Sequence, residues 1–222
     1  MKKLVIQAAA KFLVGLGLVA ALLFLPAGTW RYPNGWLLLA VLFLPMLAAG
    51  VVLLLKNPVL LQKRLDAKET EAEQKAVIAL SGLVFIAAFL AAGLSFRFQW
   101  LLFPRWVVLL GAGLFLLSYG LYAEVLRENT YLARTVEVQD NQQVIDTGLY
   151  GIVRHPMYAA TLVLFLSMGF VLGSPVSVGI LLFYIPILAY RIKHEETVLE
   201  DGLAGYADYQ TRVRYRLIPF VW

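Results

Sequence analysis

Long apolar runs constrain the fold of this chain more than any other feature. Four of them cover residues 4–26, 35–55, 76–96 and 106–126. Each reaches the about 20 residues that a helix needs to cross the hydrocarbon core of a bilayer. Because backbone polar groups in lipid must be satisfied within the segment, each run predicts a transmembrane helix.

Two shorter apolar runs follow, at 157–173 and 176–190, and the dipeptide Ser174-Pro175 separates them. Serine followed by proline is typical of a turn, so the two runs predict a helical hairpin over 157–190, whose full crossing of the membrane is left open. The expected fold is all-α and polytopic, with five or six transmembrane helices. We divide it into an N-terminal region of four helices, 1–126, and a C-terminal region, 127–222.

The composition supports a membrane protein and narrows its chemistry. Charged residues make up 15% of the chain, whereas soluble domains contain about 25%. The absence of cysteine excludes disulfides, thiolate nucleophiles and cysteine-ligated metals. With two histidines in the chain, we expect no metal site.

Basic residues indicate the orientation of the chain in the membrane. If the chain crosses six times, 16 of the 19 Lys and Arg residues lie on the side that holds both termini. By the positive-inside rule, both termini are expected in the cytoplasm. The net charge of +5 is distributed around apolar runs, so we expect no nucleic-acid partner.

The cytoplasmic connector 56–75 fits either an amphipathic surface helix or a solvated segment, and the solvated segment is favoured.

A first polar motif, Arg154-His155-Pro156-Met157-Tyr158, stands where the hairpin begins. Proline suits the first turn of a helix because its missing N–H has no partner there. The motif therefore predicts the cytoplasmic start of a helix. His155 and Tyr158 are candidates to line a cavity, or alternatively to anchor the helix among lipid headgroups.

A second polar motif, residues 191–196, ends the last apolar run and contains Arg191 and Glu195. These two residues are four apart, so they share one face if the helix continues. A carboxylate close to the membrane is costly without a partner, which makes Glu195 a functional candidate. The alternative is a solvated helix end.

Several short motifs follow one another in an order typical of one family. They are Gly148-Leu149-Tyr150, the Arg154–Tyr158 motif, the hairpin, Glu195-Glu196-Thr197-Val198-Leu199, and Gly205-Tyr206-Ala207-Asp208-Tyr209 with Pro219. Over residues 135–222 the chain resembles the isoprenylcysteine carboxyl methyltransferase and phospholipid methyltransferase superfamily. Asn57-Pro58 with Leu60-Leu61 and Arg64 is also similar to bacterial members of that family. The resemblance implies an integral protein of a prokaryotic inner membrane, in contact with membrane lipid.

The resemblance also implies a cofactor and a set of site residues. The cofactor is S-adenosylmethionine, bound in a cytoplasmic pocket without a Rossmann fold, and the methyl acceptor is a lipophilic molecule. The expected catalytic residues are Arg191, facing the anionic group of the acceptor, and Arg154. The expected cofactor-binding residues are Gln142, Gln143, Val144, Ile145, Tyr150, His155, Pro156, Met157, Tyr158, Glu195 and Glu196.

The nature of the acceptor stays open at this stage. A carboxylate is already nucleophilic at neutral pH and needs no base, so it is favoured slightly over an amine. An amine acceptor needs a residue that removes a proton, and His155 or a glutamate is the candidate. The oligomeric state cannot be predicted from these motifs.

Two other functions are considered. A membrane NADPH-dependent reductase of the sterol-reductase type is similar to the same superfamily in its C-terminal half. It needs cations for the 2′-phosphate, and Arg212, Arg214 and Arg216 are available. The other alternative is a non-catalytic scaffold or small transporter.

Overall fold

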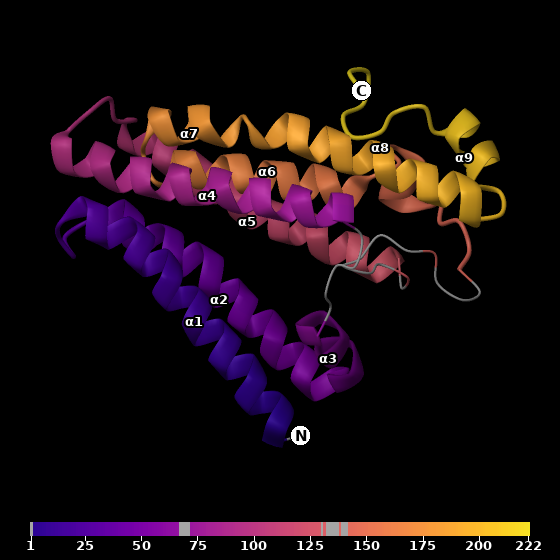
Figure 1. The fold of residues 1–222 in the computed structure, drawn as a ribbon, viewed down its shortest axis with the longest axis horizontal. Helices are drawn as coiled ribbons and strands as arrows, with labels where there is room; N and C mark the ends of the chain where they lie inside the picture. The colour runs from indigo at the N-terminus through magenta and orange to yellow at the C-terminus, as the bar shows by residue number, and fades with distance from the viewer. Residues whose placement is uncertain (1, 67–71, 130, 132–137, 139–141) are drawn as a thin grey trace.

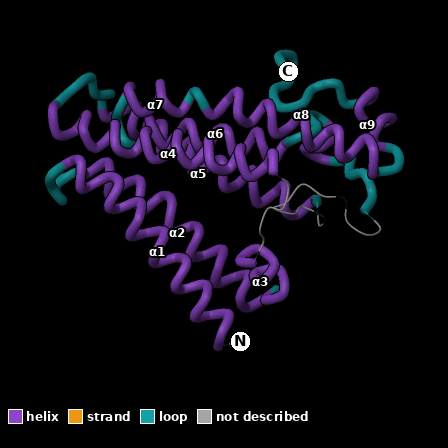
Figure 2. Tube along the Cα trace, viewed as in Figure 1, coloured by secondary structure: helices purple, strands orange, loops and turns teal. Residues whose placement is uncertain are grey.

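The computed structural model describes residues 2–66, 72–129, 131, 138 and 142–222. Within these residues the chain forms helices joined by loops and turns, with no strand (Figure 2). The elements are α1 (Lys2–Ala27), α2 (Pro33–Lys56), α3 (Pro58–Asp66), α4 (Ala72–Phe98), α5 (Arg105–Glu128), the short 3-10 helix η1 (Gly148–Gly151), α6 (Pro156–Val171), α7 (Pro175–Leu181), α8 (Tyr184–Gly202) and α9 (Tyr206–Arg212).

The predicted all-α membrane fold is confirmed. Among the described residues, five candidate spans are long and apolar enough to cross a membrane: α1, α2, most of α4, α5 and the segment Pro175–Gly202. The apolar helix α6 is shorter, at 16 residues. Five spans together with this shorter helix agree with the five or six transmembrane helices expected from the sequence.

The second arm of the predicted hairpin differs from the expectation in two ways. It is broken into α7 and α8 by a turn at 182–183, and α8 continues past Tyr190 to Gly202. Pro186 has no N–H to donate to the carbonyl of Leu182, which agrees with a new helix beginning at this point. The continuation to Gly202 places both Arg191 and Glu195 within one regular helix.

The first part of the connector is also more ordered than the favoured expectation. Residues 58–66 form α3, which packs against α1 and α2, and Leu61 is buried there. Lys11 of α1 donates a hydrogen bond to the carbonyl of Leu65. Residues 67–71 of the connector lie outside the described residues.

Three of the turns between helices lie together at one end of the molecule. Figure 1 shows the α1–α2, α4–α5 and α6–α7 turns at one end, and the N-terminus, α3 and α9 toward the other. The Phe103 N–H donates to the Gly173 carbonyl at 2.9 Å, and the Tyr32 hydroxyl donates to the Leu172 carbonyl at 2.8 Å. These bonds hold the three turns together, so the start of α6 and the end of α8 lie at the opposite end.

Close packing between α5 and α6 fixes the position of the hairpin. A Cβ atom built on Gly111 would lie 2.6 Å from the Cβ of Phe170, so only glycine allows this approach. Small residues at such crossings are typical of membrane helices. Gly111 lies within α5, in the sequence Gly111-Ala112-Gly113, and it is the point where α5 and α6 approach each other closely.

Candidate active site

The start of α6 is tied to the C-terminal tail by backbone hydrogen bonds. Pro156 occupies the first turn of α6, as the sequence predicts, and His155 is the N-cap residue. The N–H of Arg154 donates to the Tyr215 carbonyl at 2.9 Å, and the N–H of His155 donates to the Arg216 carbonyl at 2.9 Å. The two motif residues and the tail thus form one structural unit.

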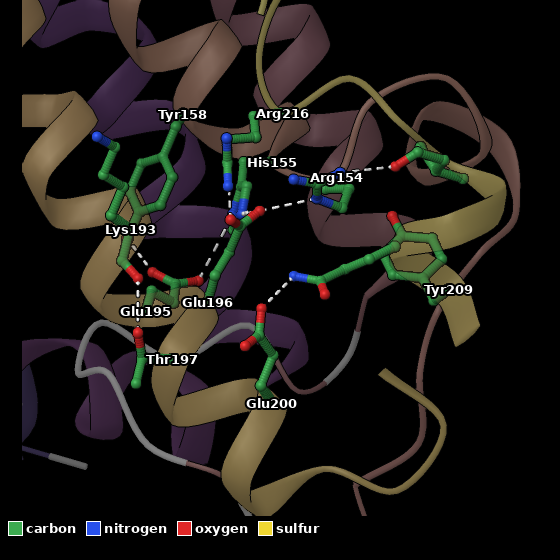
Figure 3. Close-up of polar contacts among 12 residues, drawn as sticks. Arg154, His155, Tyr158, Lys193, Glu195, Glu196, Thr197, Glu200, Tyr209 and Arg216 are labelled. Atoms are coloured by element: carbon green, nitrogen blue, oxygen red, sulfur yellow. Dashed lines mark hydrogen bonds and ion pairs between the residues drawn. The ribbon is translucent and has the colours of Figure 1, made fainter. Parts of the chain in front are cut away.

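A buried carboxylate, that of Glu196, joins three cationic or ionisable side chains (Figure 3). Its Oε1 accepts a hydrogen bond from Arg154 Nε at 2.7 Å and lies 3.1 Å from His155 Nε2. Its Oε2 accepts from Arg216 Nε at 2.7 Å. The side chain of Glu196 is only 4% exposed. A carboxylate this well buried is stable when charged partners satisfy both of its oxygens.

The neighbouring carboxylate, Glu195, belongs to a second set of contacts. It accepts a hydrogen bond from the Tyr158 hydroxyl, which in turn accepts one from Arg191 Nε at 2.9 Å. His155 Nδ1 lies 3.9 Å from Glu195 Oε1. The side chain of Glu195 is 23% exposed. Glu195 is therefore within reach of a bound molecule, whereas Glu196 is enclosed by protein.

Tyr150 connects η1 with α9 and with the end of α5. Its backbone carbonyl accepts from the Tyr209 hydroxyl at 2.7 Å, and its own hydroxyl accepts from Asn129 Nδ2 at 2.9 Å. Burial raises the pKa of Tyr150 to about 12. Its hydroxyl consequently remains neutral at physiological pH.

The loop before η1 reaches the same region through Val144. This residue packs against a buried cluster of Leu203, Tyr206, Tyr209 and Val213. Gln142 and Ile145 are half-buried, whereas Gln143 is exposed. Asp146 of this loop accepts a hydrogen bond from Arg212 Nη1 at 2.7 Å.

Comparison with known proteins shows that this arrangement is similar to one family. The model of the isoprenylcysteine carboxyl methyltransferase (ICMT) family matches residues 107–201, a range that contains Tyr150, the Arg154–Tyr158 motif and the carboxylate pair. Over residues 107–201 the chain is therefore similar to the ICMT family. The protein is therefore a membrane methyltransferase, related to isoprenylcysteine carboxyl methyltransferases.

A solved structure supports the fold. It is the structure of the eukaryotic intramembrane Ras methyltransferase ICMT, solved without a monobody. The two chains are 20% identical, with a TM-score of 0.58, and the match covers 93% of this chain and 74% of that one. None of the curated proteins compared with the chain matches it.

Within this ICMT-like chain, the structure gathers most of the residues singled out by sequence. His155, Tyr158, Arg191, Glu195 and Glu196 form a continuous series of contacts between α6 and α8. Pro156 is buried at the first turn of α6, and Met157 beside it is half-buried. Pro156 thus sets the start of the helix that presents Tyr158.

Arg154 has a different environment from the one expected of a catalytic residue. Its side chain is 6% exposed, and its Nη1 donates to the carbonyls of Val213 at 2.9 Å and Arg214 at 3.0 Å. With its Nε bound to Glu196, the guanidinium joins α8 to the tail. These contacts support a positioning role in place of direct contact with the acceptor.

Arg216 was not among the expected methyltransferase site residues. It lies in the tail, pairs with Glu196, and its guanidinium carbon lies 5.4 Å from the ring centre of Trp222. The alternating basic residues at 212, 214 and 216 are the signal in the sequence, and this pattern alone does not indicate a carboxylate partner.

Proposed function

We propose that the protein transfers the methyl group of S-adenosylmethionine to a carboxylate of a lipophilic acceptor at the cytoplasmic surface of a prokaryotic inner membrane. Both termini then lie in the cytoplasm. The observation that carries the proposal is the series of contacts from Arg191 through Tyr158 to Glu195, next to the enclosed Glu196 cluster. This series places a cation and a partly exposed carboxylate at one end of the α6–α8 pair.

The described residues are suited to hold such a cofactor. S-adenosylmethionine supplies an activated methyl group on a positively charged sulfonium. Glu195 provides a carboxylate that is exposed enough to meet a cationic ligand, and Tyr158 and His155 orient it. Val144 packs against the cluster that contains Tyr206 and Tyr209, and Tyr150 accepts a hydrogen bond from Tyr209. The buried Tyr206 hydroxyl has no partner among the described residues. We propose Gln142, Gln143, Ile145, Pro156 and Met157 as further lining residues.

Arg191 is placed to orient the acceptor. It precedes Glu195 by one helical turn, and it directly follows the apolar N-terminal half of α8. A guanidinium can bind a carboxylate with two parallel hydrogen bonds, which fixes the direction of the attacking oxygen. A lipophilic acceptor would thus place its head at Arg191 and its apolar tail among the membrane helices.

The surroundings of His155 favour a carboxylate over an amine acceptor. An amine must lose a proton, and a general base must lie within hydrogen-bond reach of it. Both ring nitrogens of His155 face glutamate carboxylates, at 3.1 and 3.9 Å, and the side chain is 4% exposed. His155 therefore orients the two carboxylates, and a carboxylate acceptor requires no base.

The arginines of the C-terminal tail support a reductase less well than a methyltransferase. Two of the three arginines that it requires are engaged by carboxylates: Arg212 pairs with Asp146 and Arg216 pairs with Glu196, each at 2.7 Å. The family match is to methyltransferases, and this also argues against a scaffold or transporter.

Replacing Glu195 with glutamine is expected to weaken S-adenosylmethionine binding about 10- to 100-fold, because a hydrogen bond to a charged group contributes about 1.5–3 kcal/mol. Isothermal titration calorimetry on detergent-purified protein measures the effect. Glu200→Gln is the matched control, because Glu200 is an exposed carboxylate of the same helix bonded to Gln210. Equal affinity of Glu195→Gln and the wild type would remove Glu195 from the cofactor site.

A further inference from the structure

The hydroxyl of Tyr206 has no hydrogen-bond partner among the residues that the structure describes, and it lies in the site region. Among the described residues, the buried side-chain oxygens that lack a hydrogen-bond partner are those of Ser177 and Tyr206. Ser177 belongs to α7, near the turns at the opposite end, whereas Tyr206 begins α9. Tyr206 is only 4% exposed. Native proteins pair nearly all buried polar groups, so an unpaired hydroxyl calls for an explanation, and a bound molecule supplies one.

The surroundings of Tyr206 connect it with both sides of the site. Its ring belongs to the buried cluster with Leu203, Tyr209 and Val213, against which Val144 packs. The charges of Glu196 and Arg154 act on its hydroxyl. The Tyr206 hydroxyl therefore interacts electrostatically with Glu195 and Glu196. Its ring lies in the cluster against which Val144, from the loop before η1, packs.

The protonation of Tyr206 limits what it can bind. Burial raises the pKa of Tyr206 far above its ordinary value; Glu196 and Glu195 raise it further, whereas Arg154 opposes them. The hydroxyl thus keeps its proton and donates. Two carboxylates nearby disfavour an anionic partner, so the fitting acceptor is a neutral oxygen or nitrogen, such as a ribose hydroxyl or a purine nitrogen.

We propose that Tyr206 binds the nucleoside part of the cofactor, donating a hydrogen bond to a neutral acceptor on the ribose or purine. This inference rests on the proposed function, because it takes S-adenosylmethionine as the cofactor. It adds a binding residue beyond the range that matches the family model, which ends at residue 201.

Tyr206→Phe removes the hydroxyl alone and tests the proposal. Affinity for S-adenosylhomocysteine and for 5′-methylthioadenosine, which lacks the amino-acid part, is expected to fall by the same factor, about 3- to 10-fold for one neutral hydrogen bond. The thermal midpoint of the ligand-free protein should stay unchanged or rise, because a buried unpaired group has been removed. Calorimetry and thermal unfolding in detergent give the two readouts.

Tyr209→Phe is the matched control. Its hydroxyl is buried in the same cluster but donates to the Tyr150 carbonyl at 2.7 Å. Removing it leaves that carbonyl without the bond, so the midpoint of the ligand-free protein should fall.

The other outcomes overturn the proposal in distinguishable ways. If Tyr206→Phe binds both ligands as the wild type does, the hydroxyl has no role in cofactor binding. If it lowers the ligand-free midpoint as Tyr209→Phe does, the hydroxyl is paired within the protein and the observation behind the proposal is lost. If the affinity for S-adenosylhomocysteine falls while that for 5′-methylthioadenosine does not, Tyr206 contacts the amino-acid part of the ligand and not the nucleoside. If the wild type binds neither ligand, the proposed function itself fails.

Discussion

Replacing Glu196 with glutamine is expected to destabilise the protein by about 3–5 kcal/mol, the range measured when one partner of a buried ion pair is removed. The neutral amide leaves the buried Arg154 without its charged partner and weakens the link to Arg216. Because Arg154 and Arg216 connect Glu196 of α8 with the tail, the tail should separate from α8. Thermal and denaturant unfolding in detergent measure the loss.

The contrast with neighbouring glutamates makes this test specific. Glu200→Gln changes an exposed carboxylate of the same helix and should alter stability by no more than about 0.5 kcal/mol. Glu195→Gln should affect cofactor binding more than folding, since Glu195 is partly exposed. A Glu196→Gln variant as stable as the wild type would contradict the structural role of the buried cluster.

Replacing Arg191 with lysine is expected to lower turnover about 100-fold while largely sparing cofactor affinity. Lysine keeps the positive charge but lacks the planar fork that orients a carboxylate. Misplacing a reacting group by about 1 Å can cost roughly 100-fold in rate. The measurement compares the rate of methyl transfer with cofactor affinity from calorimetry.

Lys193→Arg is the control for Arg191→Lys. Lys193 is exposed on the same helix, so its replacement should leave both turnover and cofactor affinity unchanged. Full activity of Arg191→Lys would exclude Arg191 from the acceptor site. A loss of cofactor affinity equal to the loss of turnover would instead assign Arg191 to the support of Tyr158 and Glu195.

Features that depend on local sequence were predictable. Apolar runs identified the four long N-terminal helices, and Pro156 marked the start of α6 correctly. The polar motifs also identified the residues that meet between α6 and α8, because charged groups next to apolar runs require partners.

Features that depend on long-range contacts were not predictable in the same way. Arg216 lies 20 positions from Glu196, in a tail without regular secondary structure beyond α9, so no periodic pattern connects the two. The sequence predicts both Glu195 and Glu196 as cofactor-binding residues. Successive residues on a helix point about 100° apart, and in the structure only Glu195 is partly exposed. The contacts of Arg154 with the tail likewise required the folded chain.

The most direct test of the central claim is a calorimetric titration of the detergent-purified wild-type protein with S-adenosylhomocysteine and, separately, with NADPH. The proposed function predicts saturable binding of S-adenosylhomocysteine, linked to a higher thermal midpoint, and no binding of NADPH. Binding of NADPH without binding of S-adenosylhomocysteine would contradict it.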